Sequence, residues 1–442
     1  MLKFACPCCG NGLFFNNFHC LACNTEVSFS PYEFNFALTA ESHNCQNRAG
    51  HGVCNWLSEP HGPFCLSCAA NQVVPDLSII GNQEKWKRLE EGKRRLIFTC
   101  LRLSISLRGL AFRFVAPTPD EPATTGHCEG VITVNIGEAD PVTREATKQN
   151  LNEKLRTIIG HFRHEFGHYY WSQQIEHNQQ ALQRFRELFG DEREDYQACL
   201  DQHYSSTNQA SPEHISVYAS AHPWEDWAET FAHYLHMRDA LETAEEFGLA
   251  PRAGSPFDFD HGLLEWQRLS VAFNEINRSM GLQDLYPFAI SDVVADKLRF
   301  IHEMVQPSPP QQQKLSIDPI DAGAVNALQE NALLDNQPSS NLAGREAYSE
   351  PNAVGPPNAA PRLENIALDP LDAGATDNQM NSANSVQEAY ADQVALDPPG
   401  VGVTPDPPPP NRVQKAYADL NARCLPSREL DYHQVAPPEF TA

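Results

Sequence analysis

Two histidines and a glutamate stand at a spacing that suits metal-dependent hydrolysis. The segment His164-Glu165-Phe166-Gly167-His168 has the pattern H-E-x-x-H. Residues four apart share one face of a helix, so both imidazoles can reach a single Zn²⁺. Glu165, beside the first histidine, can face a zinc-bound water and accept its proton. The pattern predicts a catalytic zinc with His164 and His168 as ligands and Glu165 as general base.

A catalytic zinc needs a third protein ligand and an open position for water. Pro223 suits the first position of a helix, which would place Glu225 and Glu229 on one face, one turn apart. Two carboxylates among Trp, Phe and Ala are costly to bury unless a cation receives them. We expect one of them to bind zinc and the other to hydrogen-bond a ligand histidine and fix its tautomer. His161, on the face of the motif, is expected to pack or to support a ligand rather than to bind zinc.

The N-terminal cysteines indicate structural zinc. Nine of the thirteen cysteines lie before residue 70, and two C-x-x-C pairs can place four thiolates around one tetrahedral ion. Cys8 is surplus and could replace Cys6 or Cys9, while His51 and His61 could substitute in the second site. The first predicted site is Cys6, Cys9, Cys20 and Cys23, and the second is Cys45, Cys54, Cys65 and Cys68.

These two zincs are expected to hold a small region together, because few aliphatic residues are available there for a core. Residues 1–80 carry two basic and five acidic side chains. Ribbons that bind nucleic acid usually present a basic face, so a protein partner is the favoured alternative role.

The charge of the chain excludes several functions. The 442 residues include 32 Lys and Arg against 57 Asp and Glu, a formal net charge of −25. Nucleic acid and anionic membrane surfaces would both be repelled. The sequence has no run of about 18 apolar residues and no apolar signal region after Met1. We therefore expect a cytoplasmic protein, in a reducing compartment where clustered cysteines bind metal.

Composition divides the chain into three parts, at 1–80, 81–306 and 307–442. Twenty of the 34 prolines follow residue 306, in a segment poor in aromatic residues, so the last part is predicted to be a disordered, Pro-rich acidic tail. The tail repeats itself: Ile317 to Ala324 recurs as Leu368 to Ala375, and Gln387 to Asp392 recurs as Gln414 to Asp419. These repeats could be partner motifs, although drift of a low-complexity sequence is the simpler explanation.

The middle part reads as mainly helical with a few strands, which predicts an α+β fold. Apolar spacing predicts helices over 83–103, 150–174, 181–189, 223–238, 263–280 and 291–305. Short strands are predicted over 111–115 and 131–136, and side chains of the second alternate between its two faces.

The order of these motifs resembles the gluzincin class of zinc metallopeptidases, in which an H-E-x-x-H helix is followed by a glutamate helix. The local pattern is similar to that of lethal factor-type proteases, which have H-E-[FWY]-G-H and then E-x-x-x-E. That resemblance implies Glu225 as the third zinc ligand and Tyr218, seven residues earlier, as the donor to the oxyanion, with Glu229 behind the ligands. Asp226 and Glu229 are the alternatives for the third ligand.

Residues 1–306 as a whole resemble a bacterial family described as putative zinc-binding metallopeptidases. The segments that carry this resemblance are the N-terminal ribbon, Gly52 to Leu57, Gly160 to Trp171 and Glu225 to Glu229. It implies a zincin-like domain with one catalytic zinc beside the two structural ones, acting on a protein or peptide substrate. The strand Val131 to Ile136 is expected to pair with an extended substrate. The rival hypothesis is a zinc-stabilised scaffold that binds protein partners through its ribbon or tail.

Overall fold

The computed structural model describes residues 1–39, 43–60, 62–117, 123–150, 153–206, 209–252 and 257–306. The predicted tail 307–442, with its repeats, and His61 lie outside the described residues. The described part contains both cysteine clusters and the H-E-x-x-H segment. It confirms the α+β prediction, since it is mainly helical with small sheets and begins with a zinc-ribbon region.

The ribbon region consists of short hairpins and helical turns around a small aromatic core. Phe15 and Phe29 lie 5.1 Å apart between ring centroids, and Phe29 lies 5.5 Å from Trp56. The ring of Phe98, from the first long helix, lies 5.9 Å from Phe29. The elements are β1 (Phe4–Ala5), β2 (Gly12–Leu13), β3 (Val27–Ser30), β4 (Asn35–Leu38), α1 (Gln46–His51) and α2 (Leu66–Ala69).

A four-stranded sheet follows, with the order β5-β6-β8-β7. The strands β5, β6 and β8 are parallel, and β7 is antiparallel to β8 at the edge. Alternate side chains of β6 and β8 are buried, as the sequence pattern predicted. The bounds are β5 (Asn71–Val73), β6 (Ala111–Val115), β7 (Gly126–Cys128) and β8 (Val131–Asn135).

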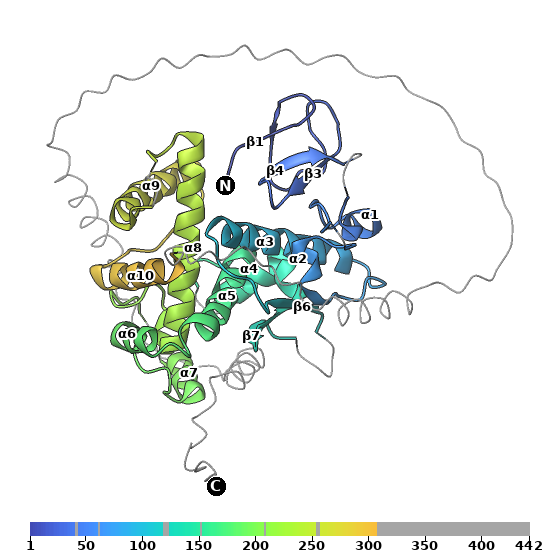
Figure 1. Cartoon of the computed structure of the whole chain (residues 1–442). Helices are drawn as coiled ribbons and strands as arrows, with labels where there is room; N and C mark the ends of the chain where they lie inside the picture. Colours follow the sequence, from blue (N-terminus) through green and yellow to red (C-terminus); the bar gives the residue numbers. More distant parts are fainter. Residues whose placement is uncertain are drawn as a thin grey trace, which may run out of the picture. The chain divides into compact units, whose positions relative to one another are not determined.

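The helices of the domain surround α8, the longest of them (Figure 1). In that view α5 lies along one side of α8, and α6, α9 and α10 lie along the other. None of the helices in the described ranges is long and apolar enough to cross a membrane. The helices are α3 (Asn82–Arg102), α4 (Pro141–Asn150), α5 (Ile158–Gln174), α6 (Gln179–Phe189), α7 (Tyr196–Ser205), α8 (Pro223–Phe247), α9 (Phe259–Ser279) and α10 (Asp292–Val305), with 3₁₀ turns η2 (Ile136–Ala139) and η3 (Tyr218–Ala221).

Two sequence predictions about these elements are wrong: the start of the H-E-x-x-H helix, and the pairing of the strand near residue 131 with substrate. The helix expected over 150–174 begins only at Ile158, because the Thr157 side chain accepts a hydrogen bond from the Gly160 N–H and caps the new helix there. The strand expected over 131–136 ends at Asn135, whose side chain accepts from the Gly137 N–H and starts η2. This strand is also an inner one, with both sides already paired, so it cannot receive a substrate strand.

The remaining differences concern the lengths of two helices and several elements that were not predicted. The α8 helix runs nine residues further than predicted, to a glycine cap at Gly248, and α9 begins four residues earlier, where Asp258 accepts from the His261 N–H. The strands β5 and β7 and the helices α4 and α7 were not predicted. Of these, α7 supplies a side chain to the site described below.

Candidate active site

The α5 helix holds the H-E-x-x-H segment in the interior of the domain. His164 is 5% exposed, Glu165 1% and His168 0%. Phe162, two residues before His164, packs on β6, with its ring 5.9 Å from that of Phe112. The helix is therefore fixed against the sheet, and its opposite face is left for α8.

The α8 helix brings the glutamates to the same place. Pro223 occupies its first turn, as predicted, and the His222 side chain caps it by accepting from the Trp224 N–H. Beside Gly167 the two helices come close enough for the Trp227 Nε1–H to donate to the Gly167 carbonyl at 2.9 Å. This contact sets the spacing between the histidines and the glutamates.

Three donor groups from the two helices converge. The Nε2 atoms of His164 and His168 lie 3.2 Å apart, and His164 Nε2 is 3.1 Å from Oε2 of Glu225. His168 Nε2 is 3.6 Å from Oε1 of Glu225, and one ligand atom from each of the three residues lies within 4.8 Å of the others. All three are buried, so the arrangement is costly without a cation among them. Two imidazoles and a carboxylate are the donors that Zn²⁺ takes in catalytic sites, so the residues fit the ion.

The two other carboxylate candidates lie elsewhere. Glu229 Oε1 accepts from Nδ1 of His164 at 2.8 Å, and its Oε2 accepts from the Ser216 hydroxyl at 2.7 Å. This contact leaves His164 Nε2 for the cluster. Asp226 forms an ion pair with Lys297 of α10 at 2.5 Å and is not one of the converging groups.

The electrostatics of the cluster favour positive charge at its centre. Burial opposes the charge on His164, but Glu225 and Glu229 outweigh it and hold the pKa of His164 well above its usual value. Burial would likewise raise the pKa of Glu229, yet the hydrogen bond from His164 lowers it to about 2. The pKa of Glu225 is also well below its usual value, because the two imidazoles outweigh burial. Both carboxylates are thus held ionised around the imidazoles.

Two tyrosines stand at the cluster. The ring of Tyr218, at the start of η3, lies 6.0 Å from the ring of His164. Tyr196, at the start of α7, donates its hydroxyl hydrogen to Oε1 of Glu225 at 2.7 Å. The sequence singled out only Tyr218.

The predicted cysteine groups come together as two sets of four. Cys45, Cys54, Cys65 and Cys68 are all fully buried, whereas Cys9 of the first set is exposed. Neither Cys8, which is exposed, nor His51, which packs against Trp86, belongs to a converging group. His161 likewise stands apart from the histidine cluster, with Nδ1 3.5 Å from a carboxylate oxygen of Glu138.

The second cysteine set lies against the helical domain. Arg94 of α3 is fully buried and donates from Nη1 to the Val53 carbonyl, next to Cys54, at 2.8 Å. Burial opposes its charge, but Cys54 and Glu90 outweigh burial and raise the pKa of Arg94. A tetrahedral zinc with four thiolates carries net negative charge, which Arg94 would offset.

Comparison with known proteins gives the family. Residues 82–304 match the family model described as putative zinc-binding metallo-peptidase, and residues 3–79 match a zinc-ribbon domain. The chain belongs to this metallo-peptidase family. Uncharacterized proteins of Mycobacterium tuberculosis and Mycobacterium bovis are each 40% identical to it over 329 residues, 69% of this chain and 95% of the relative. No solved structure matches.

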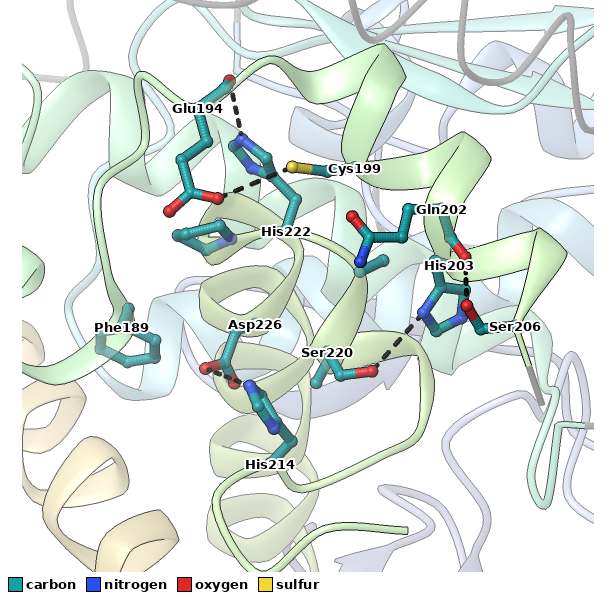
Figure 2. A pocket seen from close by; sticks show the side chains of 13 residues that line it. Phe189, Glu194, Cys199, Gln202, His203, Ser206, His214, Ser220, His222 and Asp226 are labelled. Atoms are coloured by element: carbon teal, nitrogen blue, oxygen red, sulfur yellow. Dashed lines mark hydrogen bonds and ion pairs between the residues drawn. The ribbon is translucent and has the colours of Figure 1, made fainter. Parts of the chain in front are cut away.

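A polar cavity of about 270 Å³ lies beside the start of α8 (Figure 2). Its walls come from α7, η3 and the start of α8, through His203, Ser220 and His222 among others, and it contains none of the three converging donors. Figure 2 shows the Ser220 hydroxyl turned toward the ring of His203. The Ser220 Oγ and His203 Nδ1 atoms lie 3.5 Å apart. Three of the elements that line the cavity, α7, η3 and α8, also carry Tyr196, Tyr218 and Glu225.

Sequence reasoning missed three residues of the site. Tyr196 contacts Glu225, Ser216 contacts Glu229, and Trp224 packs its ring 4.0 Å from that of His168. The N-cap residue Asp195 is a helix-start signal from which α7 could have been predicted. The contacts themselves join positions far apart in the chain, and no local pattern marks them.

Proposed function

We propose that this chain is a zinc-dependent peptidase of the gluzincin kind. The observation that carries the proposal is the convergence of His164, His168 and Glu225. Glu229 supports this arrangement by accepting a hydrogen bond from Nδ1 of His164. Glu165 adds to it, because a purely structural zinc needs ligands but no adjacent base.

The roles follow from the chemistry of each group. Zinc held by His164, His168 and Glu225 would polarise the scissile carbonyl and lower the pKa of a bound water. Glu165 takes the proton of the attacking water and delivers it to the leaving amine. Tyr218 donates to the developing oxyanion, a contact worth about 3 kcal/mol in comparable sites.

The peptide is proposed to lie along β7 rather than along the inner strand β8. Among the described strands β7 forms an edge of its sheet, and it packs against α5. Its His127 ring lies 6.2 Å from that of Tyr169, the residue after His168. An extended substrate can add to such an edge through main-chain hydrogen bonds.

The test separates the base from a ligand. Glu165→Gln should keep the zinc content of the wild type and lose hydrolysis of a peptide library, whereas Glu225→Ala should lose one zinc together with activity. Glu187→Gln, on the exposed side of α6, is the matched control and should change neither. If zinc-loaded wild type cleaves no library peptide faster than Glu165→Gln, the peptidase proposal is wrong and the scaffold hypothesis replaces it.

A further inference from the structure

We infer that Tyr196 is a positioning residue for the zinc site, which holds one oxygen of Glu225 and leaves the other for the metal. The inference rests on the proposed role of Glu225 as a zinc ligand. It concerns a residue of α7, which lies outside both helices that carry the converging groups.

The contact is buried and charge-assisted. Tyr196 is 1% exposed and Glu225 0%, and the 2.7 Å distance from Oη to Oε1 is that of a good O–H···O⁻ hydrogen bond. A buried carboxylate oxygen that loses such a donor is expensive, because burial shields it from bulk solvent. Tyr196 therefore matters for the conformation of Glu225 more than an exposed tyrosine would.

The two carboxylate oxygens of Glu225 have different neighbours. Oε1 accepts from Tyr196 and lies 3.6 Å from His168 Nε2, while Oε2 lies 3.1 Å from His164 Nε2. A carboxylate held in this way offers Oε2 to the ion and keeps Oε1 occupied. If both oxygens bound zinc, they would fill the position that a catalytic site keeps open for water. The hydroxyl of Tyr196 thus protects the open position.

Tyr196 is itself held in place. It is the first residue of α7, directly after the capping Asp195, whose side chain accepts from the Ala198 N–H at 3.0 Å. Its ring lies 5.1 Å edge-on from His222, the residue that caps α8, and 6.3 Å from Trp224. The caps of the two helices therefore set the direction in which the hydroxyl points.

Tyr196→Phe in the full chain tests the inference through metal affinity. Zinc is withdrawn by competition with a chelator, and the release step that is absent in His168→Ala identifies the histidine site. We expect Tyr196→Phe to bind zinc there 10- to 100-fold more weakly, the usual cost of losing a group behind a ligand. Tyr170→Phe is the matched control, because Tyr170 is also buried and donates instead to the Met304 carbonyl at 2.7 Å. Its affinity should equal that of the wild type.

A second measurement reports the coordination number of the metal rather than its affinity. With cobalt in the histidine site and zinc in the cysteine sites, saturated Tyr196→Phe should show the weaker visible absorption of a higher coordination number, and Tyr170→Phe should not.

The outcomes decide between this role and others. Unchanged zinc affinity with an unchanged cobalt spectrum overturns the inference, and so does a fall in kcat alone at unchanged affinity, which would make Tyr196 a catalytic residue. If Glu225→Ala keeps its zinc, the ligand assignment and the inference fail together. If the wild type cleaves no peptide, the affinity and the spectrum still decide the role of Tyr196.

Discussion

Replacing Gly167 with alanine puts a methyl group at the crossing of α5 and α8. The added Cβ would lie 3.0 Å from Cα and 3.2 Å from the carbonyl oxygen of Ala228, and 3.2 Å from Cβ of Phe231. Two of these atoms belong to the backbone of α8, so no side-chain rotation relieves the contact. The helices must move apart by a few tenths of an ångström.

Two opposing terms set the effect on stability. Alanine in a helix interior is better than glycine by about 1 kcal/mol. Extra volume in a packed core typically costs about 1–3 kcal/mol. The sum for Gly167→Ala lies between neutral and a loss of about 2 kcal/mol, without the gain that helix propensity alone predicts.

The effect on zinc should be larger than the effect on folding. His164 and His168 are on α5 and Glu225 is on α8, so a shift of the helices changes the distances between ligands directly. Metal sites tolerate deviations of only about 0.2 Å. We expect the histidine site to bind zinc at least roughly tenfold more weakly, the lower end of what a disturbed ligand shell costs.

The assays are urea unfolding with saturating zinc and chelator competition on the folded protein. Gly50→Ala is the matched control: Gly50 is also helical, in α1, and a Cβ there meets nothing within 4 Å. It should gain up to about 1 kcal/mol. If Gly167→Ala gains as much as Gly50→Ala and binds zinc like the wild type, the close crossing does not set the geometry of the site.

Three further predictions concern metal content, the second cysteine set and pH. His164→Ala should leave two zinc ions per chain where we expect three in the wild type, because the cysteine sets share no ligand with the histidine site, and elemental analysis counts them. Arg94→Met should destabilise the fold by about 3–5 kcal/mol in thermal and urea unfolding, since it leaves a buried thiolate site without its counter-charge; a change below 1 kcal/mol would show that Arg94 does not offset that site. Burial lowers the pKa of His233 to about 4 in the folded chain. The histidine of the unfolded chain is protonated already below about pH 6.5, so the free energy of unfolding should fall as the pH drops from about 6.5 to 4. His233→Gln should flatten this slope in pH-dependent unfolding and His177→Gln, at an exposed position, should not; equal slopes would contradict the assignment.

Local patterns in the sequence were enough to predict a candidate zinc site and the two helices that hold its candidate ligands. Cysteine pairs, the H-E-x-x-H spacing and the pair of glutamates one turn apart are local patterns, because a helix or a tight turn fixes the direction of side chains three or four residues apart. Helices α3, α6 and α10 were predictable for the same reason, because their apolar residues recur at helical spacing in the sequence.

Which of these groups lie together could be seen only in the folded chain. Glu225 converges with the histidines, Glu229 supports His164 and Asp226 pairs with Lys297, although all three acids lie within five residues of one another. Likewise, neither the edge position of β7 nor the hydrogen bond from Tyr196 to Glu225 could be predicted from the sequence. Helix crossing and strand order depend on packing between segments that are distant in the chain, such as the close contact of α5 and α8 at Gly167. Local sequence patterns do not predict such contacts.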